Sequence, residues 1–290
     1  MKIQSLSVDV PVNGCINACK FCVSRMDVNE YKNQMDTNLP FYDLYLKDYI
    51  KRLEFARDNG CNNVILTGKG EPQQNRNFLT TFGLLMMLME KPFRNIEMQT
   101  AGVLLDENYL RFLRNHVGVN TIALSLSALD DDVNAEINGT PEKHKVNIKN
   151  LCALIKRYDF NLRVCLNMTD YFYNWNVAGI FDECELLGAD QVTFRKLYQS
   201  PKGGTPQDKW IASNSAPEYF LTTIKEYIEE KGRALEILEY GLTRYSVHGM
   251  STVIDTDCMS SEVKETAKYL ILRPDCKLYS KWQDKGSRVF

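Results

Sequence analysis

The sequence predicts an α/β fold in which a parallel sheet closes into a partly open barrel. Strand-like and helix-like stretches alternate from residue 3 to residue 196, which is typical of βα units joined by right-handed crossovers. No internal repeat or low-complexity linker interrupts this order. The length of 290 residues also suits one large α/β barrel domain.

Six strands are expected, and turn-forming residues close several of them. Pro11, Asn13 and Gly14 break the first strand, whereas Gly68 and Gly102 follow the second and the third. The expected strands are residues 3–10, 63–67, 95–100, 120–127, 161–167 and 191–196.

Five helices are expected between these strands, and a surface helix follows the last strand. Asn59 and Gly60 end the first helix, and Gly188 ends the fifth. The six helices are residues 42–58, 78–89, 107–115, 142–158, 177–187 and 215–230. Residues 23–41 have weak periodicity, so we expect a loop with a short helix there.

The C-terminal tail has the least regular pattern. Residues 202–206 resemble a loop, and 234–238 and 269–272 resemble short strands. We therefore expect residues 1–200 to form the barrel. Residues 201–290 are expected to cover its open side as an extension of the same globular unit.

Composition and charge exclude some classes of protein. The net charge is −2 without a long basic run, so no nucleic-acid groove is indicated. The longest apolar run, residues 82–89, is too short to cross a bilayer. Nine cysteines without an N-terminal secretion signal favour a reducing compartment, so we expect a cytoplasmic protein.

Three cysteines follow the first strand in the pattern C-x3-C-x2-C, at Cys15, Cys19 and Cys22. Thiolates suit iron–sulfur clusters, zinc and copper(I), but a structural zinc needs four ligands and no fourth Cys or His stands nearby. A four-iron cluster on three thiolates keeps one iron open for a ligand that is not protein. On spacing alone, three ordinary thiols or a zinc loop completed by a distant residue remain alternatives.

A second motif, Gly68-Lys-Gly70-Glu71-Pro72, directly follows the second strand. Glycine lets the backbone approach a ligand closely, and proline stiffens the turn. Glu71 is an acceptor for an ammonium group. A plain turn is the alternative interpretation of this segment.

The cysteine spacing, the aromatic Phe21 before the last cysteine and the GxGEP segment together resemble the radical S-adenosylmethionine (SAM) superfamily. The resemblance implies a six-stranded partial (β/α) barrel, one [4Fe–4S] cluster on Cys15, Cys19 and Cys22, and SAM as cofactor. It also implies an electron donor such as flavodoxin or ferredoxin. The GxGEP segment would bind the amino end of SAM through Gly68, Gly70, Glu71 and Pro72.

Further SAM neighbours are suggested by the ends of later strands. Thr100 resembles the family's "TNG" strand end, and Ser125 with Ser127 resembles the "SLD" strand of relatives in the branch related to molybdenum-cofactor biosynthesis. Asn167 and Arg195 would point inward on the fifth and sixth strands. Arg195 suits a carboxylate of SAM or of a substrate, although an ion pair at the barrel rim is an alternative.

The remaining cysteines are not closely grouped, so we predict a single cluster, with Cys258 as a minor candidate for radical relay. The predicted protein is a monomeric or weakly associating, oxygen-sensitive enzyme that abstracts hydrogen from a small molecule. A lyase or rearrangement of a modified heterocycle, such as a queuine-type deazapurine, is our substrate hypothesis. Alternatives are a peptide-modifying or glycyl-radical-activating enzyme, a non-catalytic iron–sulfur sensor or electron carrier, and a zinc protein.

Overall fold

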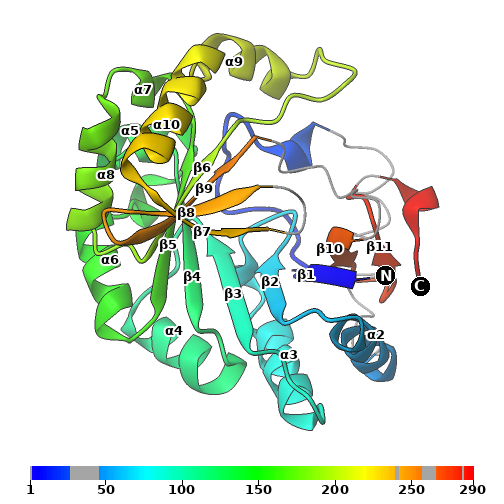
Figure 1. Cartoon of the computed structure of the whole chain (residues 1–290). Coiled ribbons are helices and arrows are strands. Elements are labelled where there is room, and N and C mark those ends of the chain that lie inside the picture. The colour runs from blue at the N-terminus through cyan, green and yellow to red at the C-terminus, as the bar shows by residue number, and fades with distance from the viewer. Residues whose placement is uncertain (1, 27–45, 239–241, 257–265, 283) are drawn as a thin grey trace.

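The computed structural model describes residues 2–26, 46–238, 242–256, 266–282 and 284–290. They form one eleven-stranded sheet surrounded by helices, in the order β11-β10-β1-β2-β3-β4-β5-β6-β9-β8-β7 (Figure 1). Cys258 lies outside the described residues, as do residues 27–45, which include most of the weakly periodic stretch and the expected start of the first helix. The α/β partial barrel predicted from the sequence is confirmed.

Six consecutive parallel strands form the centre of the sheet, as predicted. Their bounds agree with the expected ones to within one or two residues at each end. They are β1 (Lys2–Asp9), β2 (Asn63–Thr67), β3 (Asn95–Thr100), β4 (Thr121–Leu126), β5 (Asn161–Asn167) and β6 (Gln191–Arg195).

The C-terminal strands extend this sheet at both edges. β10 (Thr266–Leu272) pairs parallel with β1, and β9 (Met250–Asp255) pairs parallel with β6, so eight strands run parallel. β11 (Leu278–Tyr279), β8 (Thr243–Val247) and β7 (Arg233–Ile237) are joined to the sheet by antiparallel pairing with β10, β9 and β8 respectively. The short strands expected within 234–238 and 269–272 are thus parts of β7 and β10, and the division near residue 200 stays a prediction.

The helices cover the outside of the sheet (Figure 1). The described α-helices are α2 (Leu46–Asp58), α3 (Arg76–Leu88), α4 (Glu107–Phe112), α5 (Asp131–Ile137), α6 (Ile148–Arg157), α7 (Asp170–Tyr173), α8 (Val177–Leu186), α9 (Pro206–Asn214) and α10 (Glu218–Lys231). None of them is long and apolar enough to cross a membrane.

Local capping accounts for several differences from the expected helices. The helix expected over 142–158 starts only at Ile148, because the Asn147 side chain accepts a hydrogen bond from the Asn150 amide and caps it. The helix expected over 107–115 changes to a π-helical turn at Leu113–Val117. α9 was not predicted; Thr205 and Asp208 form a capping box at its start.

The two faces of the barrel strands differ in polarity. Side chains alternate along a strand, so Leu6 and Leu66 pack outward in the apolar core under the helices. Their neighbours Ser5, Ser7 and Thr67 line a cavity inside the barrel. The interiors of closed (β/α)8 barrels are filled with bulky branched side chains, whereas this interior is polar and hollow.

Candidate active site

The three cysteines of the C-x3-C-x2-C motif lie in the loop after β1, at the carboxyl end of the parallel strands, and all are half-buried. Burial, followed by the neighbouring thiols of Cys22 and Cys15, raises the pKa of Cys19 to about 12. Burial also raises the pKa of Cys15, with smaller contributions from Glu71 and Cys22. Three thiolates in one small space would repel one another. The positive charge of iron in a metal cluster would compensate this repulsion, so the arrangement fits a cluster site.

Hydrogen bonds hold the cysteine loop from two sides. On one side, Gln74 accepts a hydrogen bond from the Ile16 amide through Oε1 (2.8 Å) and donates one through Nε2 to the Gly14 carbonyl (3.4 Å). On the other side, the Ala18 amide donates to the Asn138 carbonyl (3.1 Å) at the end of α5. The Ile16 and Ala18 amides between the cysteines therefore have partners within the protein, which helps to pre-organise the loop for its ligands.

The GxGEP turn packs directly against the cysteine loop. A Cβ on Gly70 would lie 2.8 Å from the Gly14 carbonyl oxygen and 3.3 Å from the Cys15 Cα. A Cβ on Gly68 would lie 2.9 Å from the Val10 carbonyl oxygen. These glycines are thus required by the approach of two backbone segments, in addition to any ligand contact. Pro72 is buried and begins the short 3₁₀ helix Pro72–Gln74.

Glu71 is a buried carboxylate at this junction, with an exposed fraction of 4%. Its Oε2 accepts a hydrogen bond from the Ala101 amide (3.0 Å), whereas Oε1 has no hydrogen-bond partner among the described residues. Burial raises the pKa of Glu71 to about 7, although hydrogen bonds from Thr100 and Ala101 act in the opposite direction. A buried acceptor of this kind fits a cationic ligand group, such as the ammonium of SAM.

Two serines of β4 and the following loop have different surroundings. Ser125 is half-buried, whereas Ser127 is fully buried and donates through Oγ to Asn138 Oδ1 (2.8 Å). Asn167 in turn donates through Nδ2 to Ser127 Oγ (3.4 Å). Ser127 and Asn167 therefore belong to a buried network that includes Asn138, the residue whose carbonyl holds the cysteine loop.

The other two predicted SAM neighbours lie apart from this network. Thr100 is buried at the end of β3 beside Glu71 and accepts a hydrogen bond from the Gly102 amide (2.8 Å). Arg195, at the end of β6, lines the barrel cavity, with its Nε 4.0 Å from Asp255 Oδ2 on β9.

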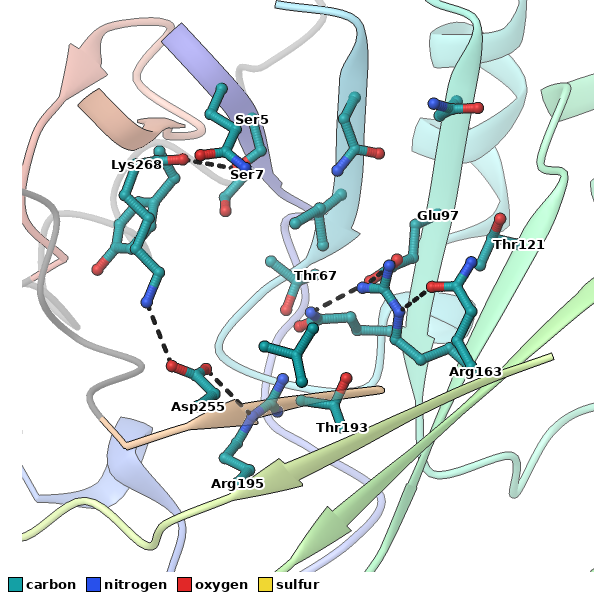
Figure 2. Close-up of a pocket in the computed structure, with 18 of the residues that line it drawn as sticks. Ser5, Ser7, Thr67, Glu97, Thr121, Arg163, Thr193, Arg195, Asp255 and Lys268 are labelled. Atoms are coloured by element: carbon teal, nitrogen blue, oxygen red, sulfur yellow. Dashed lines mark hydrogen bonds and ion pairs between the residues drawn. The ribbon is translucent and has the colours of Figure 1, made fainter. Parts of the chain in front are cut away.

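The cavity inside the barrel has a volume of about 600 Å³ and continues from the end of β2 into the barrel (Figure 2). We call this cavity the chamber. Val23 and Ser24, directly after the last cysteine of the motif, line it together with Gly68 and Lys69. The chamber therefore begins beside the cysteine loop and the GxGEP turn, and its volume is typical of small-molecule sites.

Several ion pairs in the chamber, among them those of Arg163 and Lys268, were not predicted from the sequence. Arg163 Nη1 lies 2.6 Å from Glu97 Oε2, and Lys268 Nζ lies 3.2 Å from Asp255 Oδ1 (Figure 2). The signal in the sequence was the presence of charged residues at alternate positions of strands whose other positions are apolar. The pairing itself joins distant strands, so alternation alone did not identify it.

The chain is similar in fold to native anSMEcpe with bound AdoMet, with a TM-score of 0.61, 14% identity, and coverage of 97% of this chain and 78% of that chain. It is also similar to SuiB of Streptococcus suis bound to S-adenosylmethionine (TM-score 0.58, 17% identity, 96% and 60% coverage). A third similar structure is coproporphyrinogen III oxidase (HemN) from Escherichia coli (TM-score 0.52, 14% identity, 80% and 54% coverage).

This chain therefore spans less than two thirds of the SuiB and HemN chains. No curated protein matches the sequence. The proposed likeness to the branch related to molybdenum-cofactor biosynthesis stays a prediction. The family model of the radical SAM superfamily matches residues 10–180, which include the cysteine motif and the GxGEP turn. The chain belongs to the radical SAM superfamily, and its cofactors are one [4Fe–4S] cluster and S-adenosylmethionine.

Proposed function

We propose that this chain is an enzyme that generates a 5′-deoxyadenosyl radical and uses it to abstract hydrogen from a small molecule in the chamber. When bound, the cofactors supply the chemistry: one electron cleaves SAM to methionine and the 5′-deoxyadenosyl radical, which takes a hydrogen atom from substrate to become 5′-deoxyadenosine. Cys15, Cys19 and Cys22 would hold the cluster. The observation that carries the proposal is the buried Glu71 beside this cysteine loop, with Oε1 left for a ligand.

The residues around the junction have distinct proposed roles. Glu71 accepts hydrogen bonds from the ammonium group of SAM, and Gly68 and Gly70 let the turn approach the cluster loop. Ser125, which is half-buried, contacts the ribose or the carboxylate of SAM. Ser127 and Asn167 act through Asn138 and keep the cluster loop in position.

The substrate hypothesis is a modified heterocycle, such as a queuine-type deazapurine, that undergoes elimination or rearrangement. The size and polar lining of the chamber support a small molecule rather than a folded protein. The runner-up is a peptide-modifying or glycyl-radical-activating enzyme, and a large glycyl-radical protein encoded beside this one would favour activation. We further propose a cytoplasmic location and flavodoxin or ferredoxin as the electron donor.

The test is anaerobic. The cluster is reconstituted, dithionite and SAM are added, and 5′-deoxyadenosine is measured with and without candidate heterocycles. Release that one heterocycle stimulates would support both the enzyme class and that substrate. Release without stimulation would keep the class and reject the tested heterocycles.

A full cluster without any 5′-deoxyadenosine would instead favour a sensor or electron carrier. Such a protein has no need of a SAM site, so SAM binding to the reconstituted protein separates the two functions. Zinc without sulfide in the purified protein would favour the structural zinc alternative.

A further inference from the structure

A small apolar group packs beside the cysteine loop, distinct from the large core under the helices. It joins three parts of the chain: the residues around the last cysteine of the motif, the residues directly after β6, and helix α9. Phe21 and Val23, the two chain neighbours of Cys22, belong to it. The other members are Met26, Leu197, Tyr198, Trp210 and Ile211. We call α9 together with Leu197 and Tyr198 the cover.

An aromatic contact joins the cover to the cysteine loop. The rings of Trp210 and Phe21 are tilted by 34° and their centroids lie 6.0 Å apart, which is a favourable distance for two aromatic rings. Ile211, the next residue of α9, is only 1% exposed. α9 lies at the same end of the barrel as the cysteine loop (Figure 1). The helix therefore places apolar side chains against the chain that carries Cys22.

An acidic side chain ties the chain before α9 to the first turn of this helix. Asp208 is buried and accepts hydrogen bonds from the Ser200 amide (2.8 Å) and hydroxyl (2.8 Å). It also accepts them from the Thr205 amide (3.1 Å) and hydroxyl (2.7 Å). The Thr205 hydroxyl contributes most to lowering the pKa of Asp208 to about 2, while burial acts in the opposite direction and Ser200 lowers it further. The start of the cover is therefore fixed by a carboxylate that stays charged at neutral pH.

The end of α9 is held at the carboxyl end of β5. Ser215, the residue after α9, pairs with Thr169 in an isolated antiparallel bridge, and the Ala216 amide donates to the Met168 carbonyl (2.9 Å). Thr169 in turn donates through Oγ1 to the Ser127 carbonyl (2.7 Å). Polar contacts thus hold both ends of α9, and its apolar contacts with the cysteine loop lie between them.

An apolar cover at this loop has a chemical consequence for the cofactor. A [4Fe–4S] cluster on three thiolates gains one negative charge when it is reduced, and water stabilises that charge better than apolar side chains do. Exclusion of water therefore lowers the reduction potential of the cluster. It also slows the approach of small reagents to the iron and to its thiolate ligands.

We infer that the cover shields the Cys22 side of the iron–sulfur cluster from solvent, with Trp210 on Phe21 as its central contact. Trp210 is a positioning residue in this role, because it acts on the cluster through Phe21 and the adjoining Cys22. The inference goes beyond the proposed function, since it concerns protection of the cofactor and does not depend on the substrate.

The first test is alkylation of the cluster-free protein with iodoacetamide at one fixed pH. The rate at each cysteine is measured by mass spectrometry of the digested protein. Trp210→Ala should make Cys22 react about tenfold faster, because the indole no longer covers its neighbour Phe21. Trp210→Phe keeps an aromatic ring there and should restore the rate to within about twofold of the wild type. The fully buried Cys152 and Cys184 should stay unreactive as long as the protein is folded.

The matched control is Trp175→Ala, which removes an indole that packs against the main core and Tyr171 rather than against the cysteine loop. Cys22 should react at the wild-type rate in this variant. Equal rates at Cys22 in the wild type and in folded Trp210→Ala would overturn the inference. An equal acceleration in Trp175→Ala would overturn it too, because the effect would then reflect general loosening of the protein.

A second variant keeps Trp210 and loosens the start of α9. Asp208→Asn removes the charge that collects the four hydrogen bonds, so residues 206–214 should exchange amide hydrogens faster and Cys22 should react about fivefold faster. This variant decides the question if reaction at Cys152 and Cys184 shows that Trp210→Ala has unfolded. Unchanged reactivity of Cys22 in Asp208→Asn would then overturn the inference.

The third measurement uses the reconstituted protein under anaerobic conditions. Iron release to the chelator bathophenanthroline gives the accessibility of the cluster, and a reductive titration followed by electron paramagnetic resonance gives its midpoint potential. Trp210→Ala should release iron about tenfold faster and have a higher potential, whereas Trp210→Phe should stay close to the wild type. An unchanged potential together with an unchanged rate of iron release would show that the cover does not shield the cluster.

The inference and the proposed function fail separately. Alkylation of the cluster-free protein needs neither SAM nor turnover, so it tests the cover alone. If Cys22 responds as expected and the holoenzyme forms no 5′-deoxyadenosine, the proposed function fails and the cover stands. If 5′-deoxyadenosine is formed and Cys22 does not respond, only the inference about the cover is lost.

Discussion

Glu71 and Glu97 are two buried carboxylates close to neighbouring strands, and their surroundings differ. Glu97 on β3 is 2% exposed and is paired with Arg163 at 2.6 Å, with Gln99 as a further donor (3.4 Å). Glu71 after β2 is 4% exposed and has one backbone donor, while its Oε1 lacks a partner in the part of the chain that is described. The fold itself supplies the partners of Glu97, whereas it leaves Oε1 of Glu71 for a ligand.

The largest expected effect comes from removing the cluster ligands, because the site beside Glu71 would then lack its iron–sulfur cluster. The triple variant with alanine at Cys15, Cys19 and Cys22 should contain no [4Fe–4S] cluster and form no 5′-deoxyadenosine. Iron and sulfide analysis, together with chromatography of the products, measures both. Cys152→Ala, in the buried face of α6, is the control and should keep the cluster. Turnover by the triple variant would contradict the proposed function.

Glu71→Gln removes the negative charge and keeps the shape. We expect the affinity for SAM to fall by about 10- to 100-fold, because a hydrogen bond between charged groups contributes about 1.5 to 3 kcal/mol. Equilibrium binding of SAM to the anaerobic, reconstituted variant measures this. Unchanged affinity would mean that the amino end of SAM binds elsewhere.

The stability of the ligand-free protein should depend on pH through Glu71. Its pKa is raised to about 7 in the folded state, so the folded protein binds the proton more tightly than the unfolded chain. The stabilising effect is present below about pH 4.5 and is lost as the pH rises through about 7, with a size of about 3 kcal/mol. Urea unfolding at pH 5 and pH 8 should show this loss in the wild type and a smaller one in Glu71→Gln.

Glu97→Gln should lower the stability of the folded protein and leave SAM binding unchanged. Arg163 would lose its charged partner within the chamber, so the free energy of unfolding should fall by about 3 kcal/mol. SAM affinity should stay within about twofold of the wild type, since Glu97 belongs to a completed pair. Urea unfolding and SAM binding are measured on the same preparation. A large loss of SAM affinity would contradict the proposal that Glu71 binds SAM and Glu97 does not.

Ser127→Ala has the smallest expected effect. Asn138 would lose one hydrogen bond inside the buried network, at a cost of about 1 kcal/mol. If Ser127 acts only through Asn138, the rate of cluster loss in air should rise while the affinity of the intact holoenzyme for SAM stays the same. The visible absorbance of the cluster follows the first quantity. A fall in SAM affinity alone would instead indicate direct contact between Ser127 and SAM.

The sequence predicted the six central strands well, because local alternation and breakers specify them. Asn63–Thr67, Asn95–Thr100 and Asn161–Asn167 have the expected bounds. Pairings between distant segments could not be predicted in the same way. The attachment of β9 and β10 to the two edges depends on contacts across most of the chain, which no short window contains.

The site shows the same limit. The cysteine motif and Glu71 were found through their spacing, which is a local property. Gln74 holds the cysteine loop across about sixty residues of sequence, and neither residue type nor periodicity marks it. Ser127 was predicted as a SAM neighbour from its place at a strand end. That role stays a prediction, and no local pattern indicated that its hydroxyl donates a hydrogen bond to Asn138, eleven positions later.

The pairing of β1 with β10 has a consequence for synthesis on the ribosome. Ser5 Oγ donates a hydrogen bond to the Lys268 carbonyl, 263 positions later in the chain. One edge of β1, the first strand to be translated, therefore stays unpaired until β10 has been made. In the same way, one edge of β6 stays unpaired until β9 has been made. Until then a growing chain carries two open strand edges, which are templates for aggregation. Cells that make this protein are expected to depend on chaperones that shield those edges before translation ends.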